Sequence, residues 1–161
     1  MPHAVIVVES CFGTTGRLGD AIAAGLRAAG TEVQVVPAEH APDRLSADLV
    51  LVGAPTHNTG LPTAASRGQA AQHGGAAASS GVREWIGRAT VEGRVLTFST
   101  KVAGVFSGSA GKAAARLFAR HGTQATRGED FLVTGRSGPL ADGEEARATA
   151  WGRTLAPAPA P

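Results

Sequence analysis

The chain has 161 residues, which is enough for one domain with a substantial core, and its 15 Lys and Arg nearly balance its 13 Asp and Glu. The basic residues are scattered, so the charge pattern indicates no nucleic-acid site, and no apolar run approaches the roughly 20 residues of a membrane helix. A single cysteine cannot form an intrachain disulfide and the N-terminus lacks a signal-peptide pattern, so we expect a cytoplasmic protein that does not contact membranes.

The first predicted elements are a buried strand over residues 4–8 and a helix over 16–29. The strand is a run of β-branched residues, and Leu18, Ile22 and Leu26 recur at helical spacing. The loop between them, residues 10–15, is rich in Ser, Thr and Gly. Such a loop directs backbone N–H groups, hydroxyls and the positive end of a helix dipole to one point. The sequence therefore predicts a phosphate site here.

Strands and helices alternate along the rest of the chain. Apolar runs predict further strands at 32–36, 48–53, 94–98 and 130–134, the last of these preceded by a short extended piece at 124–126. Helical spacing and caps predict helices at 63–72, 81–88, 109–121 and 143–155. The remaining segments are expected to be a linker at 38–47, a mobile stretch at 73–81 and a disordered Ala-Pro tail at 157–161, which leaves one domain over residues 1–156.

This alternation predicts an α/β fold with three layers, in which helices cover both faces of a parallel sheet. In such a sheet, ligands bind outside the carboxyl ends of the strands. The loops that follow the first, third and fourth predicted strands all carry small polar residues. We expect these three loops to meet at that edge and to form the binding site.

Six blocks of sequence carry a resemblance that covers roughly residues 4–156. They are Val-Glu-Ser-Cys-Phe-Gly-Thr-Thr at 8–15, Gly-Ala-Pro-Thr-His at 53–57, Gly-Val-Arg-Glu-Trp-Ile at 81–86, Gly-Ser-Ala at 108–110, Asp-Phe-Leu-Val-Thr-Gly-Arg-Ser-Gly-Pro-Leu at 130–140 and Asp-Gly-Glu at 142–144. In these blocks the chain resembles the flavodoxin-like FMN-binding proteins, in particular the short single-domain flavodoxin-family proteins of actinobacteria. The resemblance implies a five-stranded sheet of order 2-1-3-4-5 with FMN held by the three loops.

The resemblance also implies which residues bind FMN, and these fall in the three loops. They are Ser10, Cys11, Phe12, Gly13, Thr14 and Thr15 in the first loop, Pro55, Thr56, His57, Asn58 and Gly60 in the second, and Ser99, Thr100, Lys101 and Val102 in the third. Lys101 would stabilise negative charge on the flavin ring. No residue is assigned a catalytic role. The five histidines fall at no metal-ligand spacing, so no metal site is expected.

The function implied by the resemblance is electron transfer or flavin-dependent reduction, by an electron carrier or an FMN-dependent oxidoreductase. Its partner would be a redox protein or a small-molecule acceptor, and the resemblance also allows a homodimer. One departure from the family concerns the aromatic residues. The second and third loops contain no Trp or Tyr, and Phe106 is the one aromatic residue near the third loop. Because stacking on an aromatic side chain contributes about 1–3 kcal/mol, we expect weaker FMN binding, and a flavin-free binding module of the same fold stays open.

Two other chemistries fit parts of the first loop. The pattern from Cys11 to Arg17 is that of a phosphatase in which a thiolate attacks phosphorus and the Arg binds the oxyanion, although Leu18 stands where Ser or Thr is usual. The glycines within residues 13–19 are spaced as in the dinucleotide loop of an NAD(P)-binding reductase. These glycines begin five residues beyond Val8, and the chain has no Tyr-x-x-x-Lys pair. Both chemistries remain alternatives to FMN binding.

Overall fold

Five parallel strands form a single sheet in the order β2-β1-β3-β4-β5, as the resemblance implied. The strands are β1 (His3–Val8), β2 (Glu32–Pro37), β3 (Arg44–Pro55), β4 (Thr90–Val102) and β5 (Ala125–Val133). The computed structural model describes residues 1–159. Residues 160–161 of the predicted disordered tail therefore lie outside the described residues.

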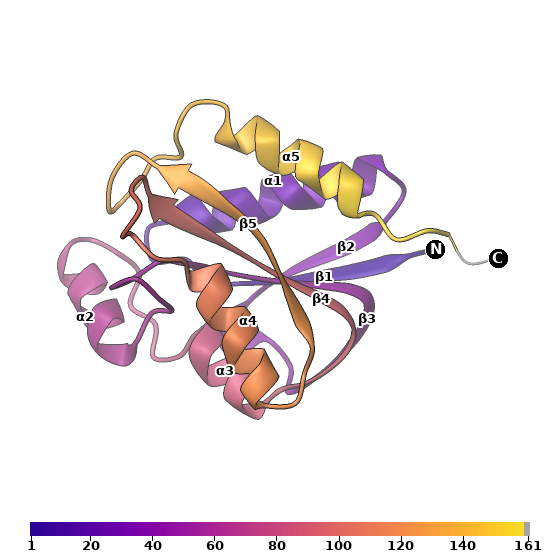
Figure 1. The fold of residues 1–161 in the computed structure, drawn as a ribbon, viewed down its shortest axis with the longest axis horizontal. Coiled ribbons are helices and arrows are strands. Elements are labelled where there is room, and N and C mark those ends of the chain that lie inside the picture. The colour runs from indigo at the N-terminus through magenta and orange to yellow at the C-terminus, as the bar shows by residue number, and fades with distance from the viewer. Residues whose placement is uncertain (160–161) are drawn as a thin grey trace.

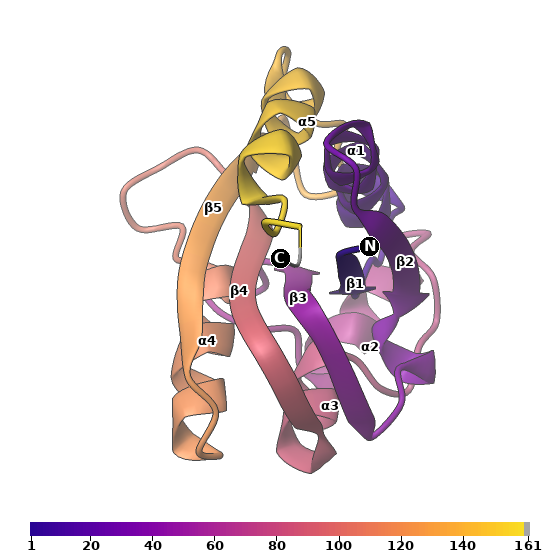
Figure 2. The same ribbon diagram turned by 90° about the vertical axis from the view of Figure 1, so that its right-hand side faces the viewer.

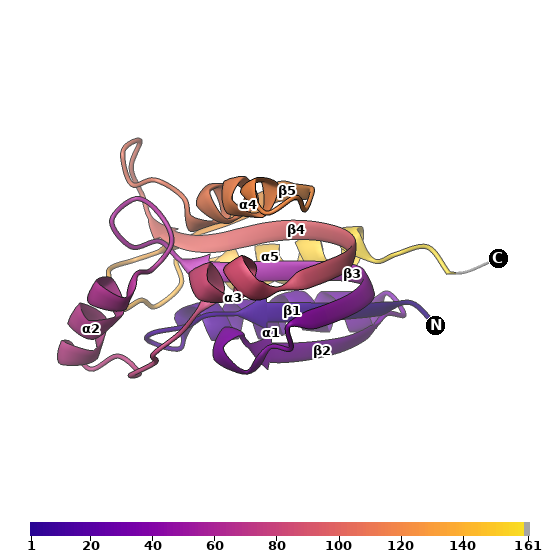
Figure 3. The same ribbon diagram turned by 90° about the horizontal axis from the view of Figure 1, so that it is seen from below.

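Helices cover both faces of this sheet, which confirms the three-layer α/β/α prediction. The helices are α1 (Thr14–Ala28), α2 (Ala64–Gln72), α3 (Val82–Arg88), α4 (Ala110–Arg120) and α5 (Glu144–Leu155), with a short 3-10 helix η1 (Ala38–His40). Helices α1 and α5 lie on one face, and α3 and α4 lie on the other (Figures 1 and 2). Helix α2 covers neither face. It stands beyond the edge to which the strand arrows point, as seen from the front and from below (Figures 1 and 3).

The core consists of two apolar layers, one on each face of the sheet. Alternate residues of each strand point to opposite faces, so β3 contributes Leu51 to the layer under α1 and α5 and Val52 to the layer under α3 and α4. Trp85 and Phe118 meet edge-on in the second layer, with their ring centroids 6.2 Å apart. Because both faces are covered, the central strands are continuous apolar runs, and these runs made the strands predictable.

Strands β3 and β4 are longer than the apolar runs predicted. Their first residues pair from Arg44 with Thr90 to Ser46 with Glu92, before a register shift. These residues lie beyond the apolar runs and are mostly polar or exposed, so no buried run marks them. At its other end β4 continues through Val102, because residues 99–102 still pair with β5. The expectation that residues 99–102 form a loop was therefore wrong, and the loop after β4 begins at residue 103.

Helices α1 and α5 cross at very short range. A Cβ atom on Gly25 would overlap the carbonyl oxygen of Thr149, and one on Gly152 would overlap the carbonyl oxygen of Ile22. Only glycine at both positions lets the two backbones approach so closely. This contact fixes α1 against the sheet and therefore fixes the position of its N-terminus at the carboxyl edge.

Candidate functional site

The loop between β1 and α1 presents unpaired backbone donors. Gly13 caps the helix in the left-handed conformation (φ 86°), and the Ser10 hydroxyl accepts the N–H of Gly16 at 3.1 Å. Among residues 1–159, no acceptor receives a hydrogen bond from the N–H groups of residues 11–15. The first turn of α1 also holds no acidic side chain. Free N–H groups at a helix N-terminus are a binding site for an anion.

A pocket of about 160 Å³, here called the main pocket, lies beside these donors at the carboxyl edge of the sheet. Its lining comes from all three predicted loops and from one further segment after β5. The lining residues are Cys11, Phe12, Thr14, Thr15, Pro55, Thr56, His57, Thr100, Lys101, Val102, Ser107, Val133, Arg136 and Gly138. None of them is an Asp or a Glu, so the pocket is suited to an anionic ligand.

Five of the predicted site residues do not line the main pocket, although the N–H of Gly13 belongs to the free donors beside it. The Ser10 hydroxyl is turned to the backbone of α1, and Gly13 is exposed at the bend of its loop. Ser99 is fully buried and donates to the carboxylate of Asp130 at 2.5 Å, so its side chain does not line the main pocket. Asn58 lines a neighbouring cavity, and Gly60 pairs with His57 inside their own loop.

Several lining residues were not predicted, and the most informative of them follow β5. Arg136 and Gly138 belong to a turn that is closed by a bridge between Val133 and Leu140. Gly138 lies against the side chain of Thr14, where a Cβ atom would overlap the hydroxyl. The turn-rich sequence after the last strand was a usable signal, because every loop that follows a parallel strand meets the same edge of the sheet.

Buried hydroxyl contacts hold the first, second and third loops together. The hydroxyls of Thr15 and Thr100 lie 2.8 Å apart, which connects α1 to the end of β4. Thr56 donates its N–H to the carbonyl oxygen of Thr100 at 2.9 Å, and its hydroxyl accepts the N–H of Ala110, the first residue of α4, at 3.1 Å. These bonds fix the walls of the main pocket before any ligand arrives.

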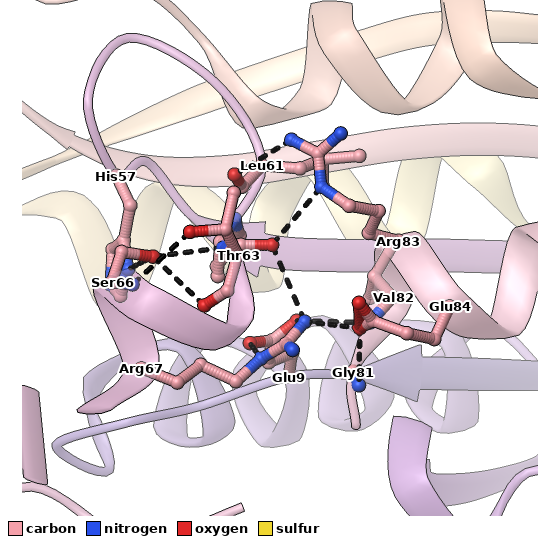
Figure 4. Close-up of polar contacts among 11 residues, drawn as sticks. Glu9, His57, Leu61, Thr63, Ser66, Arg67, Gly81, Val82, Arg83 and Glu84 are labelled. Atoms are coloured by element: carbon pink, nitrogen blue, oxygen red, sulfur yellow. Dashed lines mark hydrogen bonds and ion pairs between the residues drawn. The ribbon is translucent and has the colours of Figure 1, made fainter. Parts of the chain in front are cut away.

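His57 has a defined orientation in the second loop (Figure 4). Its Nδ1 lies 2.9 Å from the hydroxyl of Ser66, which accepts the N–H of Thr63 at 2.8 Å and donates to the carbonyl oxygen of Thr63 at 3.2 Å. This contact holds the ring through Nδ1, and among residues 1–159 no hydrogen-bond partner meets Nε2. Burial is the main cause that lowers the pKa of His57 below 6.5; the charge of Glu9 opposes it, and the charges of Arg67 and Arg136 add to it. The imidazole is therefore neutral at pH 7.

A buried ion cluster lies directly before the anion-binding loop (Figure 4). Arg67 on α2 bonds the carboxylate of Glu9 at 2.7 Å and that of Glu84 at 2.5 Å. Glu9 also accepts the N–H of Val82, and a Cβ atom on Gly81 would overlap the Glu9 carboxylate. This cluster was not predicted, because a lone Arg in a short, mostly polar helix is usually a solvent-exposed residue. The cluster connects β1, α2 and α3 at the start of the loop.

Cys11 is buried, and its backbone is hydrogen-bonded to the segment that follows α2. The segment 73–81 has no regular secondary structure, and the N–H of Ala76 donates to the carbonyl oxygen of Cys11 at 2.6 Å. Burial, followed by the charge of Glu9, raises the pKa of the Cys11 thiol despite the opposing charge of Arg67. A raised pKa keeps the thiol protonated at neutral pH, which disfavours the phosphatase alternative because that chemistry needs a thiolate.

The described residues include no group of three or more His, Cys, Asp or Glu side chains that could hold a metal ion. Within residues 1–159, no helix is both long and apolar enough to cross a membrane.

Comparison with solved structures identifies the architecture. A flavodoxin from the domain Archaea superposes with a TM-score of 0.63 at 15% identity, over 96% of each chain. The two-electron reduced flavodoxin of Megasphaera elsdenii gives 0.58 at 19% identity, over 94% of this chain and 99% of that one. The flavodoxin of Streptococcus pneumoniae TIGR4 gives 0.59 at 18% identity, over 94% and 95%. The chain has a flavodoxin-like fold. No family model and no curated protein matches the sequence, so the narrower resemblance to actinobacterial proteins stays a prediction.

Within this flavodoxin-like fold, the aromatic residues near the site are few. Phe12 is the one aromatic side chain among the lining residues of the main pocket, apart from the imidazole of His57. Phe106 is 92% exposed on the projecting loop after β4 and does not line the pocket. Trp85, which belongs to one of the resembling blocks, is buried in the core. Neither Trp nor Tyr is therefore among the residues that line the main pocket.

Proposed function

We propose that this chain binds FMN in the main pocket and acts in electron transfer or in flavin-dependent reduction. The observation that carries the proposal is the set of unpaired N–H groups of residues 11–15, which adjoin a pocket without carboxylates at the switch point of a flavodoxin-like sheet. The flavodoxin structures that share the fold support the choice of a flavin.

The residues present fit an FMN phosphate and ring. The N–H groups of residues 11–15 and the Thr14 hydroxyl would hold the phosphate, and no carboxylate lines the pocket to repel it. Lys101 and the backbone of residues 56–57 would meet the ring. Bound FMN would supply one- or two-electron redox chemistry. The side chains of the pocket would orient the cofactor, exclude water and place positive charge where reduction creates negative charge.

His57 would contribute to proton handling in this pocket. Its imidazole is bound to Ser66 through Nδ1, so Nε2 is the ring nitrogen left to meet a ligand. The surrounding contacts fix the ring through Ser66, which is itself held by both backbone groups of Thr63. A ligand in the main pocket would therefore meet a histidine ring held in one orientation, with Nε2 as its available nitrogen.

A visible-spectrum and fluorescence titration with FMN tests the proposal, and two variants localise the site. Gly13→Asp places a carboxylate among the free N–H groups, at an exposed glycine with φ 86° and open space around it. Gly30→Asp is the matched control, because Gly30 is an exposed glycine with φ 87° and equally open surroundings just beyond the other end of α1. We expect wild type and Gly30→Asp to quench FMN fluorescence and Gly13→Asp to bind at least about tenfold more weakly. A colourless wild-type protein that fails to quench FMN fluorescence refutes the proposal.

A flavin-free binding module is the second candidate. The observation that favours it is the lack of Trp and Tyr around the main pocket, together with the exposure of Phe106. Stacking contributes about 1–3 kcal/mol per aromatic contact, so FMN would lose roughly 5- to 150-fold in affinity per missing ring. In that case inorganic phosphate would still bind the loop of residues 11–15 with the same dependence on Gly13, while FMN would bind no more tightly than phosphate.

A further inference from the structure

A second cavity opens beside the main pocket and shares part of its wall. This side pocket has a volume of about 140 Å³. Phe12, Thr56, His57 and Arg136 line both cavities, and Asn58 with residues from α2 and its end forms the other wall of the side pocket. The α2 residues include Gln69 and Ala70, with His73 directly after the helix. None of these α2 residues was predicted to bind a ligand, and no function described so far uses them.

The side pocket offers cationic and hydrogen-bonding groups without a carboxylate. Arg136, which lies in the exposed turn after β5, is its permanent positive charge, and His57 and His73 contribute imidazole rings. Asn58 and Gln69 contribute amides that both donate and accept. The guanidinium of an arginine matches a carboxylate with two parallel hydrogen bonds, which makes a small organic acid a suitable occupant.

Both cavities open to solvent, so each volume describes only the part of a ligand that the protein surrounds. The side pocket, with about 140 Å³, can surround one ring with one small substituent, because an engineered cavity of about 150 Å³ holds one benzene ring. The main pocket, which is of similar volume, would likewise surround only part of FMN. Phe12 provides an aromatic wall and Ala70 adds apolar surface, so a flat ring is suited to the space between them.

We propose that the side pocket binds a small planar carboxylate, held by Arg136 and flanked by Phe12, directly beside the main pocket. This inference rests on the proposed function, because the shared wall would place such a molecule next to bound FMN. Small planar carboxylates would then be the class of molecule that the FMN-loaded protein accepts. The side pocket is a different anion site from the loop of residues 11–15, because Gln69 and His73 line the side pocket and not the main pocket.

A binding titration with benzoate tests the inference on the full chain loaded with FMN. Amide and imidazole NMR signals report the site, and benzamide, which has the same shape without the charge, is the matched probe. We expect benzoate to shift the signals of His57, Gln69 and Arg136, and to bind at least about tenfold more tightly than benzamide. Arg136→Ala should remove this preference, whereas Arg153→Ala, which removes an exposed arginine from α5, should retain it. Gln69→Trp, which fills the pocket, should abolish benzoate binding without loss of FMN binding.

Three outcomes overturn the inference: equal binding of benzoate and benzamide, no effect of Arg136→Ala, or benzoate shifts confined to residues 11–15. A titration with inorganic phosphate separates the two anion sites, because phosphate should shift residues 11–15 and should be displaced by FMN but not by benzoate. If the protein does not retain FMN, the same benzoate titration is run on the flavin-free chain. Benzoate binding there supports the side pocket and refutes only the flavin, whereas FMN binding without benzoate binding refutes only the side pocket.

Discussion

Replacement of Arg67 by methionine should be among the most destabilising single changes in this chain. The side chains of Arg67 and Glu9 are only 2% and 4% exposed, so Arg67→Met leaves the Glu9 carboxylate buried with the N–H of Val82 as its remaining partner. Breaking a buried ion pair by removing one partner costs about 3–5 kcal/mol. For a chain of this length, that loss corresponds to a fall in Tm of roughly 6–20 °C.

Urea unfolding followed by circular dichroism measures this loss, and Arg88→Met is the matched control. Arg88 also pairs with a carboxylate, that of Asp43 at 2.9 Å, but the two side chains are 38% and 67% exposed. An exposed pair contributes less than about 1 kcal/mol, so Arg88→Met should leave the free energy of unfolding nearly unchanged. The double variant Glu9→Gln/Arg67→Met should be more stable than Arg67→Met alone, because it removes the buried charge. A loss below about 1 kcal/mol for Arg67→Met would refute this reasoning.

Three further predictions concern packing and pH. Gly25→Ala should destabilise the fold by about 1–3 kcal/mol or more, because its methyl group would overlap the backbone of α5. Gly68→Ala in α2 meets open space and should stabilise the fold by up to about 1 kcal/mol. Urea unfolding of both variants measures the two effects. Burial raises the pKa of Asp130, but hydrogen bonds from Ser109, Ser99 and Arg127 outweigh burial and hold this pKa below 3.8. The contribution of Asp130 to stability is therefore present above pH 3.8 and is lost as the pH falls through the lower pKa of the folded state. Asp130→Asn should therefore be less stable at pH 7 and should lose less stability on acidification below about pH 4, as thermal unfolding across pH would show; equal pH dependence in both proteins would contradict this. An NMR titration should place the pKa of His57 below 6.5, and Arg136→Ala should raise it because one nearby positive charge is gone; an unchanged pKa in the variant would show that the charge of Arg136 does not reach the ring.

The sequence made the fold predictable because its central strands are buried on both faces. Runs such as Leu49–Val52 have no exposed positions, so hydrophobicity alone marks them as strands. The ends of β3 and β4 escaped prediction because their pairing continues into polar residues, which carry no such mark. The end of β4 shows the consequence: Ser99 was predicted to line a loop, but its hydroxyl is buried in contact with Asp130.

The candidate site was predictable only where local sequence signals a loop. Cys11 to Thr15 follow a buried strand and precede a helix, so the expected anion site could be placed there. Arg136 was missed because it belongs to a turn whose position over α1 depends on the whole sheet. Arg67 was missed because its burial is set by Glu9, 58 positions away in sequence, and no local pattern distinguishes a buried arginine from a solvated one.

The wall of the main pocket contains both Cys11, near the start of the chain, and Gly138, near its end. A ribosome must therefore release the chain at least through residue 138 before this wall is complete, and a molecule that touches the whole wall is bound only when β5 has joined the sheet. Occupancy would then stabilise the first and last strands together, since the ligand touches the loops that follow both. Ligand binding in this pocket would accordingly follow the completion of the sheet and would not help to initiate folding.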